Sequence, residues 1–367
     1  SAEMGERQYP ERCHRRAHIP SVCAGLCKKE QGRVFVTGTA GFIGFHLAKA
    51  LLEDEFLVHG YDGVTDYYDV SLKEKRLAML ECHKGFSFSR AMLEDRENLE
   101  SALRDFNPDI VLHLAAQAGV RYSLENPQAY IQSNVVGTMN LLESIRHVKP
   151  RHLLMASTSS VYGANTDMPF IELGNTDHQL TLYAATKKAN ESMSHAYAHL
   201  WEIPTTMFRF FTVYGPWGRP DMALFKFTDA ILRGDEIDVY NFGKMYRDFT
   251  YIDDLVKSIC MLIQVIPSRV EGRLEKIKGD SLSPVAPWRV VNIGNSQKVR
   301  LSDYIEAVEK ELGMRAKKNF MPLQPGDVLA TCADTSLLKA LTGYAPSTNV
   351  EEGVAKFVKW YTQYLKE

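Results

Sequence analysis

The stretch Arg33-Val-Phe-Val-Thr37, followed directly by Gly38-Thr-Ala-Gly41-Phe-Ile-Gly44, determines the expected fold. The short apolar run is typical of a buried parallel strand. Gly38 permits a tight turn, Gly41 lets the backbone approach a pyrophosphate, and Gly44 lets a helix pack close to the strand. From Phe42 to Asp54 the apolar residues recur at helical spacing. This order of strand, turn and helix predicts a dinucleotide-binding unit; an ordinary glycine-rich turn is the alternative.

A second expected strand, 56–61, ends at Asp62. An acidic residue at this place accepts hydrogen bonds from the ribose 2′-hydroxyl of the cofactor and repels a 2′-phosphate. The pyrophosphate would lie over the N-terminus of the first helix, where free N–H groups point. We therefore expect NAD rather than NADP, with a capping role for Asp62 as the alternative.

Far downstream, Tyr183-Ala-Ala-Thr-Lys187 places a phenol and an ammonium one helical turn apart. A neighbouring ammonium favours phenolate and is expected to lower the pKa of the tyrosine from about 10. The pair would then act as a general base that takes the proton of a sugar hydroxyl while a hydride leaves the same carbon. This spacing is common in helices, and the glycine motif upstream is what favours the catalytic interpretation.

The 367-residue chain is 45% apolar and 24% charged, which is ordinary for a globular protein. Its net charge of −2 gives no indication of a nucleic-acid or anionic-membrane partner. A phosphate-bearing ligand must therefore be held by local features. No run of about 18 apolar residues is present, so we expect no membrane span.

The first 31 residues are basic and show no clear periodicity. They contain Cys13, Cys23 and Cys27 beside two histidines, but no Cys-x-x-Cys pair, so we expect no metal site. They also lack the apolar core of a signal peptide, and we expect a mobile extension on a cytoplasmic protein.

Through residue 210, strand-like runs alternate with helical patterns, which predicts βαβ units and a parallel sheet. The fold class is therefore α/β, a doubly wound Rossmann sheet followed by a smaller C-terminal substrate-binding domain. The expected boundaries are 32–210 and 211–367, with segments of the two interleaved, and a polar loop over 272–287. The expected strands are 109–113, 152–156 and 204–209, and the expected helices are 94–106, 127–147 and 184–200.

The expected strand 152–156 runs into the hydroxyl-rich segment Ser157-Thr-Ser-Ser-Val-Tyr-Gly163. Ligands of a doubly wound sheet bind at the carboxyl ends of its strands, so these hydroxyls should face the cleft. One of them could pass a proton between a sugar hydroxyl and Tyr183. Such loops are common at strand ends, and an ordinary loop is the alternative.

A set of longer motifs gives the chain a family resemblance over about residues 32–365. The chain resembles the extended short-chain dehydrogenase/reductases through the glycine motif, His113-Leu-Ala-Ala116, 157–163, the Tyr183/Lys187 pair and Arg247-Asp-Phe-Thr-Tyr-Ile-Asp-Asp254. More narrowly it is similar to UDP-glucuronate 4-epimerases through Arg121-Tyr-Ser-Leu-Glu-Asn-Pro127, Phe211-Thr-Val-Tyr-Gly-Pro-Trp-Gly-Arg-Pro-Asp-Met222 and Asn241-Phe-Gly-Lys-Met245. The resemblance implies tightly held NAD, a UDP-hexuronate substrate and a homodimer formed through the helices near 127–147 and 184–200.

The resemblance also implies roles for individual residues. The catalytic hydroxyl falls on Thr158, and the base and lysine fall on Tyr183 and Lys187. The expected cofactor-binding residues are Gly38, Gly41, Phe42, Ile43, Gly44, Asp62, Met92, Leu93, Leu114, Ala115, Ala116, Tyr183 and Lys187. The expected substrate-binding residues are Ser159, Ser160, Thr212, Arg219, Val239, Tyr240, Arg247 and Asp327.

Four of these roles are specific. Arg247 matches the phosphate-binding arginine, and Asp327 is placed to contact the uridine ribose. Galactose 4-epimerases carry an arginine where this chain has Gln324, which puts one phosphate contact in doubt. Many relatives place an aspartate near the adenine where this chain has Met92, so adenine recognition would rest on backbone groups of Met92 and Leu93.

The residues after Thr158 separate the reactions that the family catalyses. Related 4,6-dehydratases carry Asp-Glu there, since elimination needs an added acid and base, and decarboxylases carry Glu at the second position. This chain has Ser159 and Ser160 instead. Together with Thr212 and Arg219 they would form a cradle of hydrogen-bond donors for the C6 carboxylate of a uronate.

The leading hypothesis is a UDP-glucuronate 4-epimerase. Tyr183 would remove the C4 hydroxyl proton through or beside Thr158 while the C4 hydride passes to NAD, and the 4-keto sugar would turn over and take the hydride back. The alternatives are a UDP-glucose/UDP-galactose 4-epimerase, a UDP-glucuronate decarboxylase, and a non-catalytic NAD-binding regulator, against which the Thr158, Tyr183 and Lys187 set argues.

Overall fold

The structure, a computed structural model, describes residues 32–269 and 277–366. The N-terminal extension with its three cysteines, and residues 272–276 of the expected polar loop, lie outside these ranges. None of the helices in the described part of the chain combines the length and the apolar character needed to cross a bilayer.

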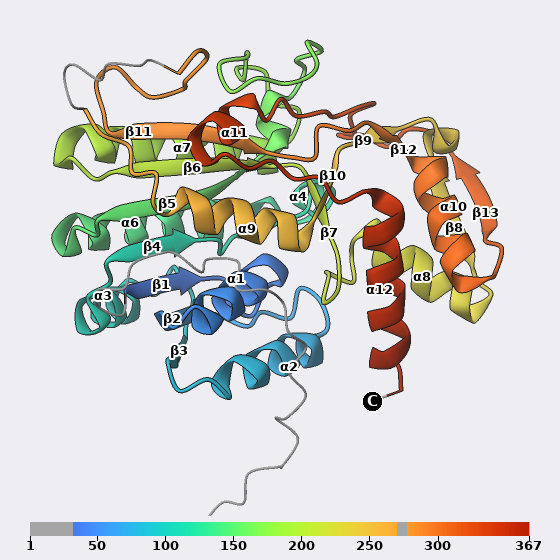
Figure 1. The fold of residues 1–367 in the computed structure, drawn as a ribbon, viewed down its shortest axis with the longest axis horizontal. Coiled ribbons are helices and arrows are strands. Elements are labelled where there is room, and N and C mark those ends of the chain that lie inside the picture. Colours follow the sequence, from blue (N-terminus) through green and yellow to red (C-terminus); the bar gives the residue numbers. More distant parts are fainter. Residues whose placement is uncertain (1–31, 270–276, 367) are drawn as a thin grey trace, which may run out of the picture.

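A seven-stranded parallel sheet forms the centre of the molecule, with the strand order β11-β6-β5-β4-β1-β2-β3 (Figure 1). The strands are β1 Arg33–Thr37, β2 Leu57–Asp62, β3 Phe86–Arg90, β4 Ile110–His113, β5 His152–Thr158, β6 Thr205–Phe210 and β11 Trp288–Ile293. The chain order reverses beside β1, so the carboxyl ends of β1 and β4 flank a switch point. The doubly wound α/β fold predicted from the sequence is confirmed.

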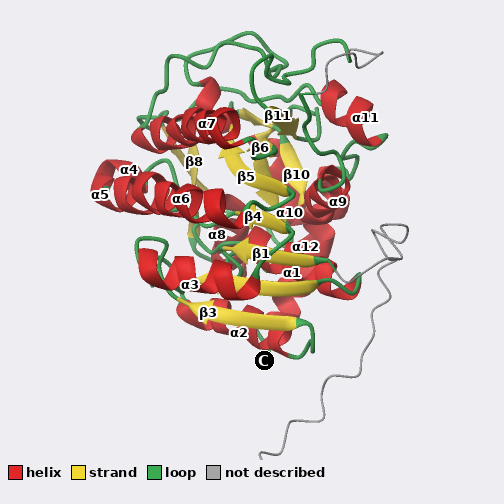
Figure 2. Cartoon of the chain, turned by 90° about the vertical axis from the view of Figure 1, so that its left-hand side faces the viewer, coloured by secondary structure: helices red, strands yellow, loops and turns green. Residues whose placement is uncertain are grey.

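Helices cover both faces of this sheet (Figure 2). On one face α3 Arg96–Phe106, α6 Thr138–Val148 and α7 Leu182–Trp201 pack side by side. On the other face α1 Phe42–Glu53 packs against α2 Val70–Glu81 and α9 Ile252–Leu262. Strands β1, β4, β5, β6 and β11 are buried on both sides, whereas the edge strand β3 is partly exposed and alternates apolar and polar residues.

The C-terminal part of the chain adds a smaller unit beside the carboxyl edge of the sheet (Figure 1). It contains three strand pairs: β7 Thr212–Tyr214 with β10 Phe249–Tyr251, β8 Glu236–Tyr240 with β13 Lys317–Met321, and β9 Tyr246–Arg247 with β12 Val299–Arg300. Its helices are α8 Ala223–Arg233, α10 Leu301–Leu312 and α12 Val350–Tyr364, whereas α11 Ser336–Thr342 packs on α9 and β11 of the main sheet. Helix α10 packs on both α8 and α12.

The structure differs from the sequence-based expectation in several elements. The expected strand 56–61 begins one residue later, and β3, α2 and β11 were not predicted. The expected helix 127–147 consists of α5 Pro127–Tyr130, a π-helical segment η1 Ile131–Gly137 and α6. The hydroxyl-rich segment is not a loop: Ser157 and Thr158 end β5, and η2 Ser159–Tyr162 is a 3₁₀ turn that Thr158 caps by accepting the Ser160 N–H at 3.2 Å. That cap explains why a run of hydroxyls forms an ordered turn.

Candidate active site

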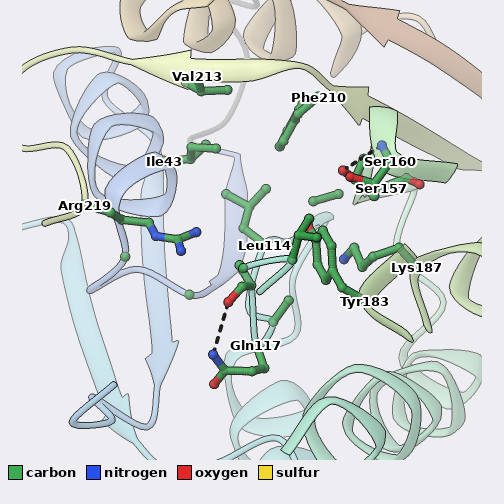
Figure 3. Close-up of a pocket in the computed structure, with 18 of the residues that line it drawn as sticks. Ile43, Leu114, Gln117, Ser157, Ser160, Tyr183, Lys187, Phe210, Val213 and Arg219 are labelled. Carbon is green, nitrogen blue, oxygen red and sulfur yellow. Dashed lines mark hydrogen bonds between the residues drawn. The ribbon is translucent and has the colours of Figure 1, made fainter. Parts of the chain in front are cut away.

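A cavity of about 640 Å³ opens at the carboxyl edge of the parallel sheet. Its walls come from the β1–α1 turn, the ends of β2, β4, β5 and β6, the start of α7, and segments of the C-terminal unit (Figure 3). This is the edge at which ligands of doubly wound sheets bind. The structure therefore brings residues from both parts of the chain to one site.

Close contacts within the β1–α1 turn leave no room for side chains at its glycines. A Cβ on Gly44 would lie 2.0 Å from the Gly38 carbonyl oxygen, and one on Gly41 would lie 3.0 Å from the same oxygen. Gly38 itself has a φ of 80° and lies against the backbone of Ala115. The turn thus presents bare backbone to the cavity just before the N-terminus of α1.

The Asp62 carboxylate is tied to this turn. It accepts the Ala40 N–H at 3.0 Å and the Val64 N–H at 2.7 Å. Burial raises the pKa of Asp62, opposed by these hydrogen bonds and by the nearby Lys73 ammonium. Asp62 lines the cavity, so the capping role and the ribose-binding role are compatible.

Met92 and Leu93 line the same end of the cavity. Their carbonyl oxygens already have protein donors: the Tyr61 hydroxyl lies 3.1 Å from the Met92 oxygen, and the Asn140 amide lies 3.1 Å from the Leu93 oxygen. Recognition of adenine by backbone groups here stays a prediction, and these carbonyls would have to share their lone pairs.

Thr158, at the end of β5, lines the same cavity as Tyr183 and Lys187, which lie in the first turns of α7. Figure 3 shows the side chains of Tyr183 and Lys187 next to each other. Thr158 lies near enough to Tyr183 to lower the pKa of the phenol. The expectation that Lys187 lowers the pKa of Tyr183 is wrong for this structure. Burial raises the pKa of the phenol, and the groups that oppose this are Thr158 and Arg219.

Lys187 is buried at 2% exposure. Burial lowers its pKa to about 8, and the Glu191 carboxylate opposes that shift. The Lys187 ammonium donates no hydrogen bond to any residue in the described ranges. A buried ammonium that faces a cavity with free donors fits a ligand that carries hydroxyl or phosphate oxygens.

Ser159, Ser160, Thr212 and Arg219 all line the cavity, but the structure does not bring them into one contact cluster. Figure 3 shows Arg219 and Ser160 on opposite sides of Tyr183. The Arg219 guanidinium is paired with Asp221, at 2.9 Å from Nε to Oδ1, and Asp221 also accepts the Tyr67 hydroxyl at 3.2 Å. Arg219 is therefore oriented by a partner that the sequence analysis did not assign to the site.

Arg247 and Asp327 line the opening on the side of the C-terminal unit. One Arg247 nitrogen donates to the Tyr246 carbonyl at 2.9 Å, and burial lowers the pKa of this arginine, opposed by Asp327. Asp327 pairs at 2.8 Å with Arg121, whose guanidinium lies 4.1 Å from the centre of the Tyr240 ring. Arg121 begins the motif 121–127, but the sequence did not predict a role for it. Only the fold shows that its side chain reaches Asp327.

Two expected substrate-binding residues do not line the cavity. Val239 is 1% exposed and belongs to the hydrophobic core, so its side chain cannot contact a ligand there. The Tyr240 ring is occupied by Arg121. Both lie on β8, where a period of two sends Val239 inward, and any contact to a ligand from Val239 would have to come from its backbone.

Two further residues carried no readable signal in the sequence: Lys73, which lines the cavity, and Tyr130, which packs behind it. Lys73 donates to the Thr65 carbonyl at 2.5 Å beside Asp62. The Tyr130 ring packs edge-on against Tyr183 at 6.0 Å between ring centres.

Within residues 32–269 and 277–366 no group of acidic, histidine or cysteine side chains is arranged to hold a metal ion.

This combination of a parallel sheet, a side-chain-free βα turn and a Tyr/Lys helix at one cavity defines a dinucleotide-binding protein of the short-chain dehydrogenase/reductase type. The family model described as GDP-mannose 4,6 dehydratase matches residues 35–357. The chain belongs to this family of NAD-dependent sugar epimerases and dehydratases.

Individual relatives narrow the resemblance. The chain is 58% identical over 332 residues to a probable UDP-glucuronate 4-epimerase of Rhizobium meliloti (strain 1021), covering 90% of this chain and 97% of that one. It is 45% identical to UDP-glucuronate 4-epimerase 4 of Arabidopsis thaliana, covering 90% of this chain and 75% of the plant protein. It superimposes with a TM-score of 0.81 and 33% identity on a crystal structure of UDP-glucuronic acid 4-epimerase from Bacillus cereus in complex with UDP-glucuronic acid and NAD, covering 90% and 99% of the two chains.

Proposed function

We propose that this protein is an NAD-dependent UDP-glucuronate 4-epimerase, which interconverts UDP-glucuronate and UDP-galacturonate. The observation that carries the proposal is that Thr158, Tyr183 and Lys187 line one cavity together with the glycine-rich turn, Arg219 and Arg247. The high identity to UDP-glucuronate 4-epimerases along nine tenths of the chain supports the same substrate.

The residues present fit NAD. The glycines at 38, 41 and 44 permit the close backbone packing of a turn that lines the cavity without side chains, and the Lys187 ammonium has free donors. Asp62 would accept the 2′-hydroxyl of the adenosine ribose and would repel a 2′-phosphate. When bound, NAD accepts a hydride from C4 of the sugar and later returns it.

Tyr183 is the proton acceptor in the proposed reaction. Its phenolate takes the proton of the C4 hydroxyl, directly or through Thr158, and returns it to the oxygen after the 4-keto sugar has shown its other face. Thr158 and the Arg219 charge both lower the pKa of Tyr183 and so favour its phenolate. Lys187 remains an ammonium on the same helix, where it would hold ligand oxygens in place.

The C6 carboxylate needs control because the 4-keto intermediate is a β-keto acid that can lose CO₂. Ser159, Ser160, Thr212 and Arg219 would donate hydrogen bonds to this carboxylate. Since these side chains lie on different walls of the cavity, the cradle would form around the substrate. Holding the carboxylate keeps its bond to C5 from aligning with the C4 carbonyl.

We further propose a homodimer formed through the helices near 127–147 and 184–200. Met139 on α6 is 42% exposed and Leu200 on α7 is 63% exposed, so apolar side chains are available on these helices. The division into units at residue 210 and the cytoplasmic location stay predictions. Light scattering on the protein and on Leu200→Lys would test the dimer, which should dissociate in the variant.

The test of function is incubation of the purified protein with UDP-glucuronate, without added NAD, followed by product NMR. UDP-galacturonate is the expected product. A UDP-pentose would instead indicate a decarboxylase, and turnover of UDP-glucose alone would indicate a neutral-sugar epimerase. Analysis of the released cofactor should find NAD, and finding NADP, or equal binding of both, would contradict the role of Asp62.

A further inference from the structure

Behind the Tyr183/Lys187 pair lies a buried carboxylate, Glu191, which the proposed mechanism does not use. Glu191 follows Lys187 by one turn of α7 and is 3% exposed. Its Oε1 accepts the Ser157 hydroxyl at 2.6 Å and the Arg209 Nε at 2.9 Å, and its Oε2 accepts a terminal nitrogen of Arg209 at 2.9 Å. Despite burial, the pKa of Glu191 is lowered by Arg209 and Ser157, so the group is a carboxylate.

This carboxylate joins the elements that carry the site. Ser157 is the residue before Thr158 on β5, Arg209 lies on the adjacent strand β6, and Glu191 lies on the helix of Tyr183. Arg209 extends the connection by donating to the Tyr162 hydroxyl at 3.1 Å and the Glu172 carbonyl at 2.9 Å. Glu191 is thus hydrogen-bonded from the strand that ends at Thr158.

Glu191 is also the carboxylate that acts on Lys187. Among the charged groups of the described ranges, it is the one that raises the pKa of Lys187 against burial. His113 on β4 faces Lys187 but is neutral, because burial and the lysine charge lower its pKa to about 3. Tyr183 is the other titratable group of α7 beside Lys187, and burial raises its pKa against the effects of Thr158 and Arg219. Tyr130 is a neutral phenol because burial raises its pKa, and η1 contains no titratable residue.

We propose that Glu191 is a positioning residue for the proposed epimerisation: held by Arg209 and Ser157, its carboxylate keeps the Lys187 ammonium charged and fixes the end of β5 that carries Thr158. The inference rests on the proposed function for its activity readout. It goes beyond that function because it concerns a side chain that touches neither sugar nor cofactor.

The distinguishing consequence concerns pH. A lysine that must be protonated supports activity below its pKa, and activity is lost as pH rises through that pKa. Removing a nearby negative charge lowers the pKa of the lysine. Glu191→Gln should therefore move the alkaline limb of the kcat profile to lower pH. A move of about one pH unit corresponds to roughly tenfold lower turnover at a pH above both limbs.

The experiment compares wild type, Glu191→Gln and Asp280→Asn. Asp280 pairs at 2.8 Å with Arg289, an arginine buried on β11, and Asp280 does not line the cavity. Both variants should lose thermal stability. Of these two variants, only Glu191→Gln should move the alkaline limb. Glu191→Asp, which keeps the charge but places it farther from Lys187, should move the limb by a smaller amount than Glu191→Gln does.

A second readout is independent of turnover. The ¹³Cε resonance of Lys187 in lysine-labelled protein, identified by its loss in Lys187→Arg, should titrate at lower pH in Glu191→Gln. The proposal would be overturned if Glu191→Gln left both the Lys187 resonance and the alkaline limb at their wild-type pH while its melting temperature fell as in Asp280→Asn. If Glu191→Gln does not fold, Glu191→Asp is measured, and its more distant carboxylate should move both readouts part of the way; no movement contradicts the proposal. The NMR titration of Lys187 needs no substrate. If the proposed sugar substrate is wrong, the turnover assay would show no activity, but the titration would be unaffected.

Discussion

The two sides of the cavity are formed by different kinds of groups, backbone on one side and charged side chains on the other. On the cofactor side the backbone of the β1–α1 turn faces the cavity, and a Cβ on Gly44 would lie 2.0 Å from the Gly38 oxygen. On the sugar side the walls carry charged side chains that already have partners, Arg219 with Asp221 and Arg121 with Asp327. Backbone held by a strand and a helix needs no rearrangement to bind. Paired side chains must share or exchange partners when a ligand binds. The free energy of binding on that side is therefore the difference between the interactions gained with the ligand and those lost within the protein.

The largest expected effect concerns the residue between the two sides. Tyr183→Phe should lower kcat for UDP-glucuronate by at least about 100-fold, because it removes the general base. Calorimetric binding of UDP-glucuronate should stay close to wild type, since the pocket is kept. The control is Tyr361→Phe on α12, which removes a hydroxyl that donates to Asp229 at 2.8 Å. This variant should retain full turnover. Near-normal turnover of Tyr183→Phe would exclude tyrosine from the mechanism.

The next effect tests the cofactor side. Gly44→Ala forces a Cβ against the Gly38 oxygen, and overpacking of about 1–3 kcal/mol implies roughly 5- to 150-fold less bound NAD. The measurement is the NAD content of the purified protein. Gly353→Ala, also crowded but against the Tyr214 ring away from the turn, should lower the melting temperature and leave NAD content unchanged. Equal NAD content in all three proteins would show that the turn does not approach the cofactor.

On the sugar side, Arg247→Ala should weaken UDP and UDP-glucuronate alike. Loss of a charge-assisted hydrogen bond of about 1.5–3 kcal/mol corresponds to roughly 10- to 100-fold in affinity. Titration calorimetry with UDP measures it. Arg233→Ala, which removes an exposed arginine paired with Asp229, is the control and should change nothing. Unchanged UDP affinity in Arg247→Ala would mean that Arg247 does not hold the phosphates.

The smallest expected effect is one of selectivity. Arg219→Ala should raise the KM for UDP-glucuronate about tenfold and the KM for UDP-glucose much less, because a charge-assisted bond contributes only with the charged substrate. Product NMR of the variant should also show more UDP-pentose. Steady-state kinetics with both sugars provides the comparison. Equal losses for the two substrates would mean that Arg219 serves the turn and Asp221 but not the carboxylate.

Much of the fold could be read from local pattern. The apolar run 33–37 and the glycines after it predict β1 and α1, and α1 begins at Phe42 as expected. Strand β11 could not be predicted in this way, because it pairs with β6 across an intervening stretch of short mixed elements. The same holds for Arg121, whose partner Asp327 lies 206 residues away in the chain.

The sequence by itself determined the elements whose cause is local: the glycine turn, the strands with their apolar runs, and the helical spacing of Tyr183 and Lys187. The tertiary structure alone decided the ionisation of these two residues. Burial raises the pKa of Tyr183, opposite to the effect expected from its spacing to Lys187, and lowers the pKa of Lys187 to about 8. Desolvation depends on all the groups that surround a side chain, so these pKa shifts follow from the assembled fold and not from neighbours in sequence. The contacts of Glu191 with Ser157 and Arg209 behind this pair are likewise made only in the folded chain.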